Sequence, residues 1–420
     1  MGRLRYSSFG KISNRVARFW PNIDWTLLFL VIGVTFIGGT TIHSVEMHST
    51  KDHWSQHLLF GVIGIVICLS LARWRYDNLL KLHWFTYAFT NLILIAVKFF
   101  GTSAKGAENW ITIAGIKFEP SEFAKLGVII TLAALLHQKP ITNLTQLVKV
   151  LAITAIPFLL VFFQPDLGTS LVFGAVTIGM LYWSNINRGW LFLLVSPLVS
   201  MILFNVYFPA WLIWTLILLL VAWLSLPWRI IGALGVLLVT FASGWAGKIL
   251  WSVLKTYQKN RIVVFLDPDH NILGSGYQLT QSRITIGSGG LWGKGLFHGP
   301  QTQLNFVPEQ HTDFIFSAIG EEWGFVGCVV LVLLFWLICL RLVLIAHKAK
   351  NNFGALLVIG ISSMILFQTM INIGMTIGLA PITGIPLPWL TYGRSSLITN
   401  FIAIGLAQSV ANFRLSRKEY

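Results

Sequence analysis

Long apolar segments recur along almost the whole of this 420-residue chain, and they constrain its fold more than any other feature. A helix needs about 20 mostly apolar residues to cross a bilayer, and lipid offers no partner to an unbonded backbone group. We therefore predict an all-α, polytopic integral membrane protein that forms a single domain over residues 1–420. The twelve predicted spans lie at 25–42, 57–72, 84–100, 120–137, 146–163, 168–183, 189–204, 211–226, 230–254, 324–346, 355–378 and 397–413.

Composition and charge support a membrane protein and argue against a nucleic-acid partner. Only 11% of the residues are charged, whereas a soluble domain carries about a quarter. The net charge of +15 is not gathered into a basic patch, because the basic residues lie at segment ends in alternate connections. This positive-inside pattern predicts that both termini are cytoplasmic. The basic residues concerned are Arg3, Arg5, Lys11, Arg15, Arg18, Arg73, Arg75, Lys139, Arg188, Arg229, Lys348, Lys350, Arg414, Arg417 and Lys418.

Counting spans from a cytoplasmic start assigns three polar stretches to the outer face. The longest, 255–312, is a large extracytoplasmic loop rich in Gly and Gln, and a long loop with its own character is more often functional than a mere connector. The second stretch is 101–119. The third, 380–396, reads APITGIPLPWLTYGRSS, and its prolines predict irregular backbone at the membrane surface.

Asp313 is a candidate functional carboxylate at the end of the large loop. It follows VPEQHT and precedes the helical run FIFSAIGEEWG, which places it at the outer mouth of a membrane helix. An aspartate there could cap the free amides of the helix. Catalysis is compatible with capping, and Glu309 and His311 raise the local density of ionisable groups.

Glu122, Lys125 and Asp166 are ionisable residues in or beside predicted spans. Glu122 and Lys125 are three residues apart and share one helical face. Charges in lipid are costly unless they are paired or face a cavity, so we expect these side chains to point inward. A structural ion pair between Lys125 and Asp166 is one interpretation, and a polar cavity for an anionic head group is the other.

The glycine-rich run GSGYQLTQSRITIGSGGLWGKG does not indicate a nucleotide site, since it lacks GxxxxGK[ST] and follows no strand. Residues 287–290 are better interpreted as a tight turn between two amphipathic segments. Arg283 and Lys294 would then be available to a pyrophosphate.

A set of motifs in order along nearly the whole chain resembles the SEDS (shape, elongation, division and sporulation) family. The most specific is GKGLFHGPQTQLNFVPEQHTDFIFSAIGEEWGFVG, and HGPQTQLNFVPE and GIPLPWLTYG resemble the RodA-like elongation branch more than the division branch. The other motifs are GAENWI, EPSEFAK, QPDLGTS, YQKNRIVVFLDP, GSGYQLTQS, NIGMTIGLAPITGIPLP and TYGRSS.

The resemblance implies a glycosyltransferase that joins lipid II disaccharides at the outer face of the bacterial cytoplasmic membrane, together with a class B penicillin-binding protein. Asp313 matches the family's essential aspartate, and Lys125 with Asp166 matches its internal ion pair. We expect the substrate-binding side chains within the matching motifs and the polar runs beside them. They are Glu122, Lys125, Asp166, Arg261, Gln281, Ser282, Arg283, Glu309, His311, Thr312, Trp110 and Ser395.

Three features depart from the family's pattern. Asn109 stands where the family commonly has Arg, and Arg394 stands where it has Gly in YGGSS. The family usually has ten spans, so the apolar pair between Gly189 and Leu226 is predicted to be an added hairpin that preserves sidedness.

The resemblance also implies a mechanism. We expect Asp313 to accept or orient the proton of the acceptor hydroxyl, while Arg261, Arg283, Lys125 or a divalent cation such as Mg or Mn stabilises the departing pyrophosphate. No second carboxylic acid is required, because pyrophosphate leaves as an anion. Two alternatives stay open, namely a lipid II flippase and a non-catalytic scaffold that recruits the penicillin-binding protein.

Overall fold

The fold is described from a computed structural model, which covers residues 22–47, 52–104, 107–113, 116–139, 141, 143–226, 229–267 and 276–414. Several basic residues used for the topology prediction, from Arg3 to Arg18 and at Arg417 and Lys418, lie outside this part of the chain. The side chain of Asn109 also lies outside it.

All twelve predicted spans form helices. Ten helices in the described part of the chain are long and apolar enough to cross a membrane. Of the other two, α7 has only 17 residues, and α16 has a more polar composition. The twelve are α2 (Trp25–Val45), α3 (His53–Arg73), α4 (Asp77–Phe100), α5 (Pro120–Gln138), α6 (Leu144–Phe163), α7 (Leu167–Trp183), α8 (Arg188–Val206), α9 (Phe208–Ser225), α10 (Arg229–Val253), α14 (Ile315–His347), α15 (Asn352–Ile377) and α16 (Arg394–Asn412).

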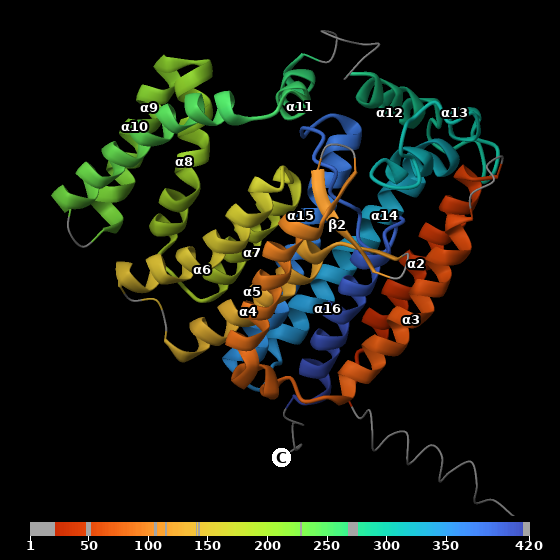
Figure 1. Cartoon of the computed structure of the whole chain (residues 1–420), viewed down its shortest axis with the longest axis horizontal. Helices are drawn as coiled ribbons and strands as arrows, with labels where there is room; N and C mark the ends of the chain where they lie inside the picture. Colours follow the sequence, from red (N-terminus) through yellow and green to blue (C-terminus); the bar gives the residue numbers. More distant parts are fainter. Residues whose placement is uncertain are drawn as a thin grey trace, which may run out of the picture.

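Both long polar stretches contain regular structure that hydropathy does not predict. The stretch 101–119 holds a three-stranded antiparallel sheet of β1 (Thr102–Ala104), β2 (Ala107–Ile113) and β3 (Ile116–Phe118), in the order β1-β2-β3. The large loop, 255–312, holds α11 (Thr256–Leu266), α12 (Tyr277–Ser288) and the short α13 (Pro300–Gln303). In Figure 1 these three helices lie at the upper end of the bundle, and the last turn of α16 lies at the lower end.

The interior of the bundle is built around α5 and α15, which are the most buried of the ten spanning helices. Small residues let neighbouring helices approach closely, as is typical of membrane bundles. A Cβ added at Gly360 of α15 would lie 2.7 Å from Ile129 of α5, and one at Gly64 of α3 would lie 2.2 Å from the Phe401 ring of α16. These contacts bring α15 against α5 and α3 against α16, and α15 also contacts α16.

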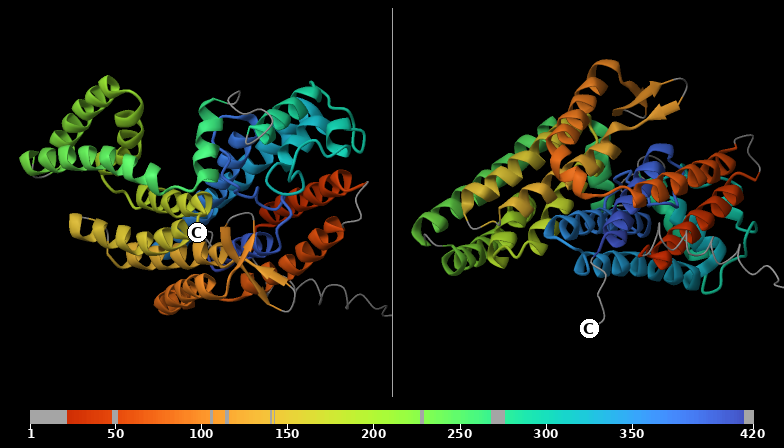
Figure 2. Two further views of the ribbon diagram at one scale, coloured as in Figure 1. Left: turned by 45° about the horizontal axis from the view of Figure 1, so that its top comes forward. Right: turned by 90° about the horizontal axis from the view of Figure 1, so that it is seen from below.

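The predicted extra hairpin corresponds to α8 and α9, and it packs with α10 as a separate group of three helices. Leu218, Ala222 and Val236 form a small core of their own within this group. In both α8 and α10, only 11% of the residues in the apolar stretch are buried within the protein, so most of the surface of these helices faces lipid. Figure 2 shows the three helices projecting from one side of the molecule.

Gly324 interrupts α14 with a backbone conformation that other residues avoid. Its φ of 67° and ψ of −166° lie in a region used almost only by glycine, and a Cβ there would lie 2.3 Å from the nitrogen of Gly293. We expect Gly324→Ala to destabilise the protein by more than about 3 kcal/mol, because the contact adds to a strain of that order. The measurement is the melting temperature in detergent.

Gly235→Ala is the matched control for this variant. Gly235 lies in α10 with open space around its Cβ position, so alanine should leave the melting temperature unchanged or raise it. Equal melting temperatures for Gly324→Ala and the parent protein would contradict the assignment of strain to Gly324.

Candidate active site

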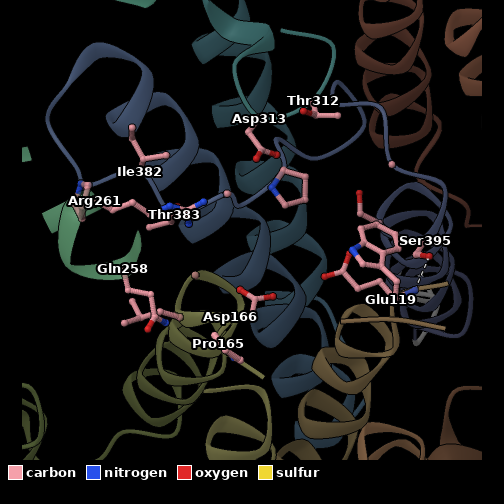
Figure 3. A pocket seen from close by; sticks show the side chains of 18 of the residues that line it. Glu119, Pro165, Asp166, Gln258, Arg261, Thr312, Asp313, Ile382, Thr383 and Ser395 are labelled. Carbon is pink, nitrogen blue, oxygen red and sulfur yellow. Dashed lines mark hydrogen bonds between the residues drawn. The ribbon is translucent and has the colours of Figure 1, made fainter. Parts of the chain in front are cut away.

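A cavity of about 270 Å³ opens beside α11, where α5, α7, α14, α15 and α16 begin or end. It is lined by the start of α7, one face of α11, the turn before α14, the irregular segment after α15 and the first turn of α16 (Figure 3). Six of the predicted site residues line this cavity. They are Trp110, Asp166, Arg261, Thr312, Asp313 and Ser395.

Asp313 lies in the turn that precedes α14, and it is not the cap of that helix. The capping position is Phe314, which makes no side-chain capping bond. The amide of Asn372 donates to the carbonyl oxygens of Asp313 (2.9 Å) and Ile385 (2.8 Å), which ties the turn to the irregular segment after α15. Figure 3 shows the Asp313 carboxyl pointing into the cavity. Asp313 is therefore not the N-cap residue of α14, and its carboxyl faces the cavity.

Arg261 and Asp313 both approach one point on the cavity wall. A Cβ placed on Gly384 would lie 3.5 Å from Asp313 Oδ2 and 3.9 Å from Arg261 Nη1. The φ of Gly384 is 74°, which glycine adopts without a steric penalty. The bare backbone at Gly384 therefore lets an acidic and a basic side chain come close to one point of the cavity wall.

Two further carboxyls face the same space. Figure 3 shows Asp166 below Asp313 and Glu119 to one side of it. Burial raises the pKa of Glu119 to about 8, and the negative charges of Glu122 and Asp166 add to this effect. Burial also raises the pKa of Asp166, against hydrogen bonds from Thr169 and the positive charge of Lys125. At neutral pH the Glu119 side chain is therefore mostly a neutral carboxylic acid.

The raised pKa of Glu119 predicts a pH dependence of stability. An unperturbed glutamic acid titrates at 4.5, so between pH 4.5 and about 8 the folded protein binds more protons than the unfolded chain. Stability should then fall as the pH rises through this window. We expect Glu119→Gln to flatten the decline of the melting temperature from pH 5 to pH 8, and an unchanged slope would contradict the assignment.

Lys125 and Glu122 lie behind the cavity wall and are fully buried. Lys125 Nζ is 2.7 Å from Glu122 Oε1, and both side chains are 1% exposed. The direct ion pair of Lys125 is thus with Glu122, one turn away on α5. The positive charge of Lys125 also opposes the rise in the pKa of Asp166. The predicted pairing of Lys125 with Asp166 stays a prediction.

The other predicted binding residues lie beside the cavity and not in its lining. The Ser282 hydroxyl donates to the carbonyl of Thr376 (2.8 Å), and Arg283 donates to the carbonyls of Ile377 and Gly378 (3.3 Å each). These bonds dock α12, which also carries Gln281, onto the end of α15.

Glu309 and His311 belong to the same turn as Asp313. Glu309 Oε2 accepts a hydrogen bond from the Thr312 hydroxyl (3.1 Å). The His311 ring stacks on that of His53, with ring centroids 5.1 Å apart.

Sequence reasoning missed several cavity residues, among them Glu119, Gln258, Thr383 and Tyr392. Glu119 directly precedes α5 in the EPSEFAK motif, and an acid at a loop-to-helix junction beside other buried charges was an available signal. Gln258 shares a helical face with Arg261, three residues later. No local signal points to Thr383 or Tyr392, which reach the cavity only through the path of the irregular segment.

The described residues contain no group of three or more His, Cys, Asp or Glu side chains arranged to hold a metal ion. The three carboxyls around the cavity are therefore not a preformed metal centre. A divalent cation bound there would draw part of its oxygen ligands from a phosphorylated substrate.

Comparison with known proteins places the chain in a family. The family model described as Cell cycle protein (FtsW/RodA/SpoVE) matches residues 22–213 and 198–416. The peptidoglycan glycosyltransferase RodA of Treponema pallidum is 33% identical, over 93% of this chain and 97% of its own length. The peptidoglycan glycosyltransferase MrdB of Escherichia coli K12 is 31% identical, over 94% and 96%. The chain therefore belongs to the FtsW/RodA/SpoVE family.

Solved structures share the fold. A chain from the study "Structural coordination of polymerization and crosslinking by a peptidoglycan synthase complex" matches with a TM-score of 0.72 and 27% identity, over 94% of this chain and 99% of its own. The rod shape-determining protein RodA of Thermus thermophilus matches with a TM-score of 0.62 and 25% identity, over 94% and 98%. The arrangement of the spanning helices is thus that of RodA structures.

Proposed function

We propose that the protein polymerises lipid II into glycan strands in the cavity between α7, α11, α14 and α16. Asp313 is the residue that activates the acceptor sugar. The observation that carries this proposal is that Asp313 and Arg261 both line the cavity and both lie close to Gly384. The enzyme class rests on the relatives: the chain is a peptidoglycan glycosyltransferase of the RodA type, with a role in cell elongation.

The proposal is supported by the chemistry of the lining, because glycosyl transfer from a lipid pyrophosphate needs a base and a positive charge and the cavity contains a carboxyl and a guanidinium. The Asp313 carboxylate accepts the proton of the acceptor hydroxyl as its oxygen bonds to the anomeric carbon of the donor. The bond between that carbon and the pyrophosphate oxygen breaks, and undecaprenyl pyrophosphate leaves as an anion. Arg261 lines the cavity, so its fixed positive charge can stabilise the leaving group.

The other predicted cations are less well placed for this role. Lys125 is buried against Glu122, and Arg283 is engaged at the end of α15. Arg261 is therefore the protein cation that we assign to the leaving group. A divalent cation would supply additional positive charge to the pyrophosphate when bound.

The size of the cavity suggests which part of the substrate it holds. Pockets for small ligands usually enclose about 300 to 1,000 Å³, and this cavity of about 270 Å³ lies just below that range. It suits the reacting sugar and its pyrophosphate. The peptide and the prenyl chain would lie outside it, the prenyl chain among the membrane lipids.

We also propose that the cavity faces the outside of the cytoplasmic membrane, with both termini inside and a class B penicillin-binding protein as partner. The alternation of basic connections supports this orientation. The partner is supported by the structural likeness to a chain from a peptidoglycan synthase complex. Lipid II exposes its sugars on the outer face only after export, so the orientation is necessary for the reaction.

Cysteine labelling in cells tests the orientation. Trp292 lies in the large loop and is 80% exposed, whereas the exposed Lys348 lies at the far end of α14. We expect a membrane-impermeant maleimide to label Trp292→Cys in intact cells and to label Lys348→Cys only after permeabilisation. The reverse labelling pattern would mean that the cavity faces the cytoplasm, where it could not reach the sugars of exported lipid II.

Gel analysis of glycan strands made from purified lipid II, with and without the partner, tests the reaction itself. Strands that require both the chain and lipid II support the proposal. Lipid scrambling in proteoliposomes without strand synthesis would instead indicate a flippase. If the partner made equal strands without this chain, the chain would be a scaffold.

A further inference from the structure

Arg394 joins the start of α16 to the start of α3 through neutral groups. Its Nη2 donates to Gln56 Oε1 (2.6 Å), its Nε donates to the Tyr392 hydroxyl (3.2 Å), and its guanidinium lies over the Phe60 ring, 5.7 Å from the centroid. Within the described part of the chain no carboxylate forms an ion pair with Arg394. The guanidinium therefore serves as a fork of hydrogen-bond donors and not as one half of a salt bridge.

Tyr392 is the group that this fork orients. Its hydroxyl donates to Gln56 Oε1 (2.8 Å) while it accepts from Arg394, so Arg394, Gln56 and Tyr392 form a closed triangle of hydrogen bonds. The Tyr392 ring also packs against His53, with centroids 4.4 Å apart, and lines the cavity. Both its hydroxyl and its ring are thereby held in one position.

The backbone of Tyr392 in turn braces the turn that carries Asp313. The Tyr392 N–H donates to the carbonyl of His311 (3.0 Å), two residues before Asp313. The turn begins at Glu309, whose φ of 60° is uncommon for a residue other than glycine. Such strained backbone persists only where its surroundings hold it in place. Tyr392 and the stacked His53 are part of those surroundings.

We propose that Arg394 is a positioning residue for glycosyl transfer: through Tyr392 it fixes the turn that sets the Asp313 carboxyl against the reacting sugar. Arg394 itself is not part of the cavity lining, so it acts through Tyr392 and not on the substrate. The inference rests on the proposed role of Asp313. Displacing a reacting group by about 1 Å can cost about 100-fold in rate, so loss of the fork should lower kcat and leave substrate binding largely intact.

Steady-state kinetics of Arg394→Met with lipid II test this role. Methionine keeps an apolar side chain over Phe60 and removes the donors. We expect kcat to fall about 10-fold with KM within about twofold of the parent value. Arg394→Lys should restore only part of kcat, because one ammonium cannot reproduce a planar fork. Tyr392→Phe, which loses a single oxygen atom, should resemble Arg394→Met, and the double variant should be no slower than either single variant.

Arg75→Met is the matched control, since Arg75 also hydrogen-bonds a side chain (Asp77 Oδ2, 3.1 Å) and lies over a phenylalanine ring (Phe413, 5.6 Å), at the other end of α3. Its kcat should equal that of the parent. A raised KM with normal kcat, additive effects of Arg394→Met and Tyr392→Phe, or a lower melting temperature with normal kcat would each overturn the inference.

Asp313→Asn in the same assay separates this inference from the proposed function. An inactive Asp313→Asn beside a fully active Arg394→Met refutes only the role of Arg394. An active Asp313→Asn refutes the proposed function itself. If Arg394→Met does not fold, Tyr392→Phe alone decides, because its loss of kcat at unchanged KM is still required.

Discussion

Asp313→Asn is expected to lower the rate of lipid II polymerisation by about 10² to 10⁴, the usual contribution of a positioned general base. Asparagine has nearly the same shape and keeps the backbone bond from Asn372, so the turn should stay in place. What is lost is the negative charge that accepts the proton of the acceptor hydroxyl. The measurement is the initial rate of strand synthesis by purified protein with its partner.

Asp267→Asn is the matched control for Asp313→Asn. Asp267 is an exposed carboxylate at the end of α11, outside the cavity lining but in the same large loop. Its removal should leave the rate near that of the parent. A rate for Asp313→Asn within threefold of the parent, with normal folding, would show that the base is another group.

Lys125→Met is expected to give the largest loss of stability among single substitutions in the site. The 2.7 Å pair of Lys125 and Glu122 is 1% exposed on both sides, so methionine would leave a buried carboxylate without its cation. Removing one partner of a buried pair costs about 3 to 5 kcal/mol. We expect a markedly lower melting temperature and a lower yield of folded protein in detergent.

The double variant Lys125→Met with Glu122→Gln should recover much of this loss, because no unpaired charge remains. The exposed pair of Arg75 and Asp77 provides the contrast, since surface pairs contribute only about 0 to 1 kcal/mol. A double variant no more stable than Lys125→Met would mean that the lysine stabilises the protein by some means other than its pairing with Glu122.

Hydropathy predicts the spanning helices because each must satisfy its own backbone and present apolar side chains to lipid. It fails at the start of α14, which was predicted at 324 but begins at Ile315. The first turns of α14 contain Glu321 and Glu322, which read as polar although both are buried. The Glu321 carboxyl accepts hydrogen bonds from the amide (2.8 Å) and the hydroxyl (2.6 Å) of Thr302, a contact with the large loop that hydropathy does not reveal.

The residue types of the candidate site could be predicted from local motifs. The direction in which each side chain points could not, because it depends on how the helices pack. Asp313, Arg261 and Asp166 come from separate motifs, and the fold brings all three to one cavity. Arg283 carries the same charge as Arg261, but α12 docks against α15 and directs Arg283 to helix-end carbonyls. The role of Tyr392 depends on its contact with the carbonyl of His311, which lies 81 residues earlier in the chain.

A cryo-EM structure of Asp313→Asn with its partner and lipid II tests the central claim most directly. The claim predicts density for the pyrophosphate beside Arg261 and a sugar hydroxyl within hydrogen-bonding distance of residue 313. Lipid II bound with its sugars and pyrophosphate away from Gly384, and with this cavity empty, would contradict it.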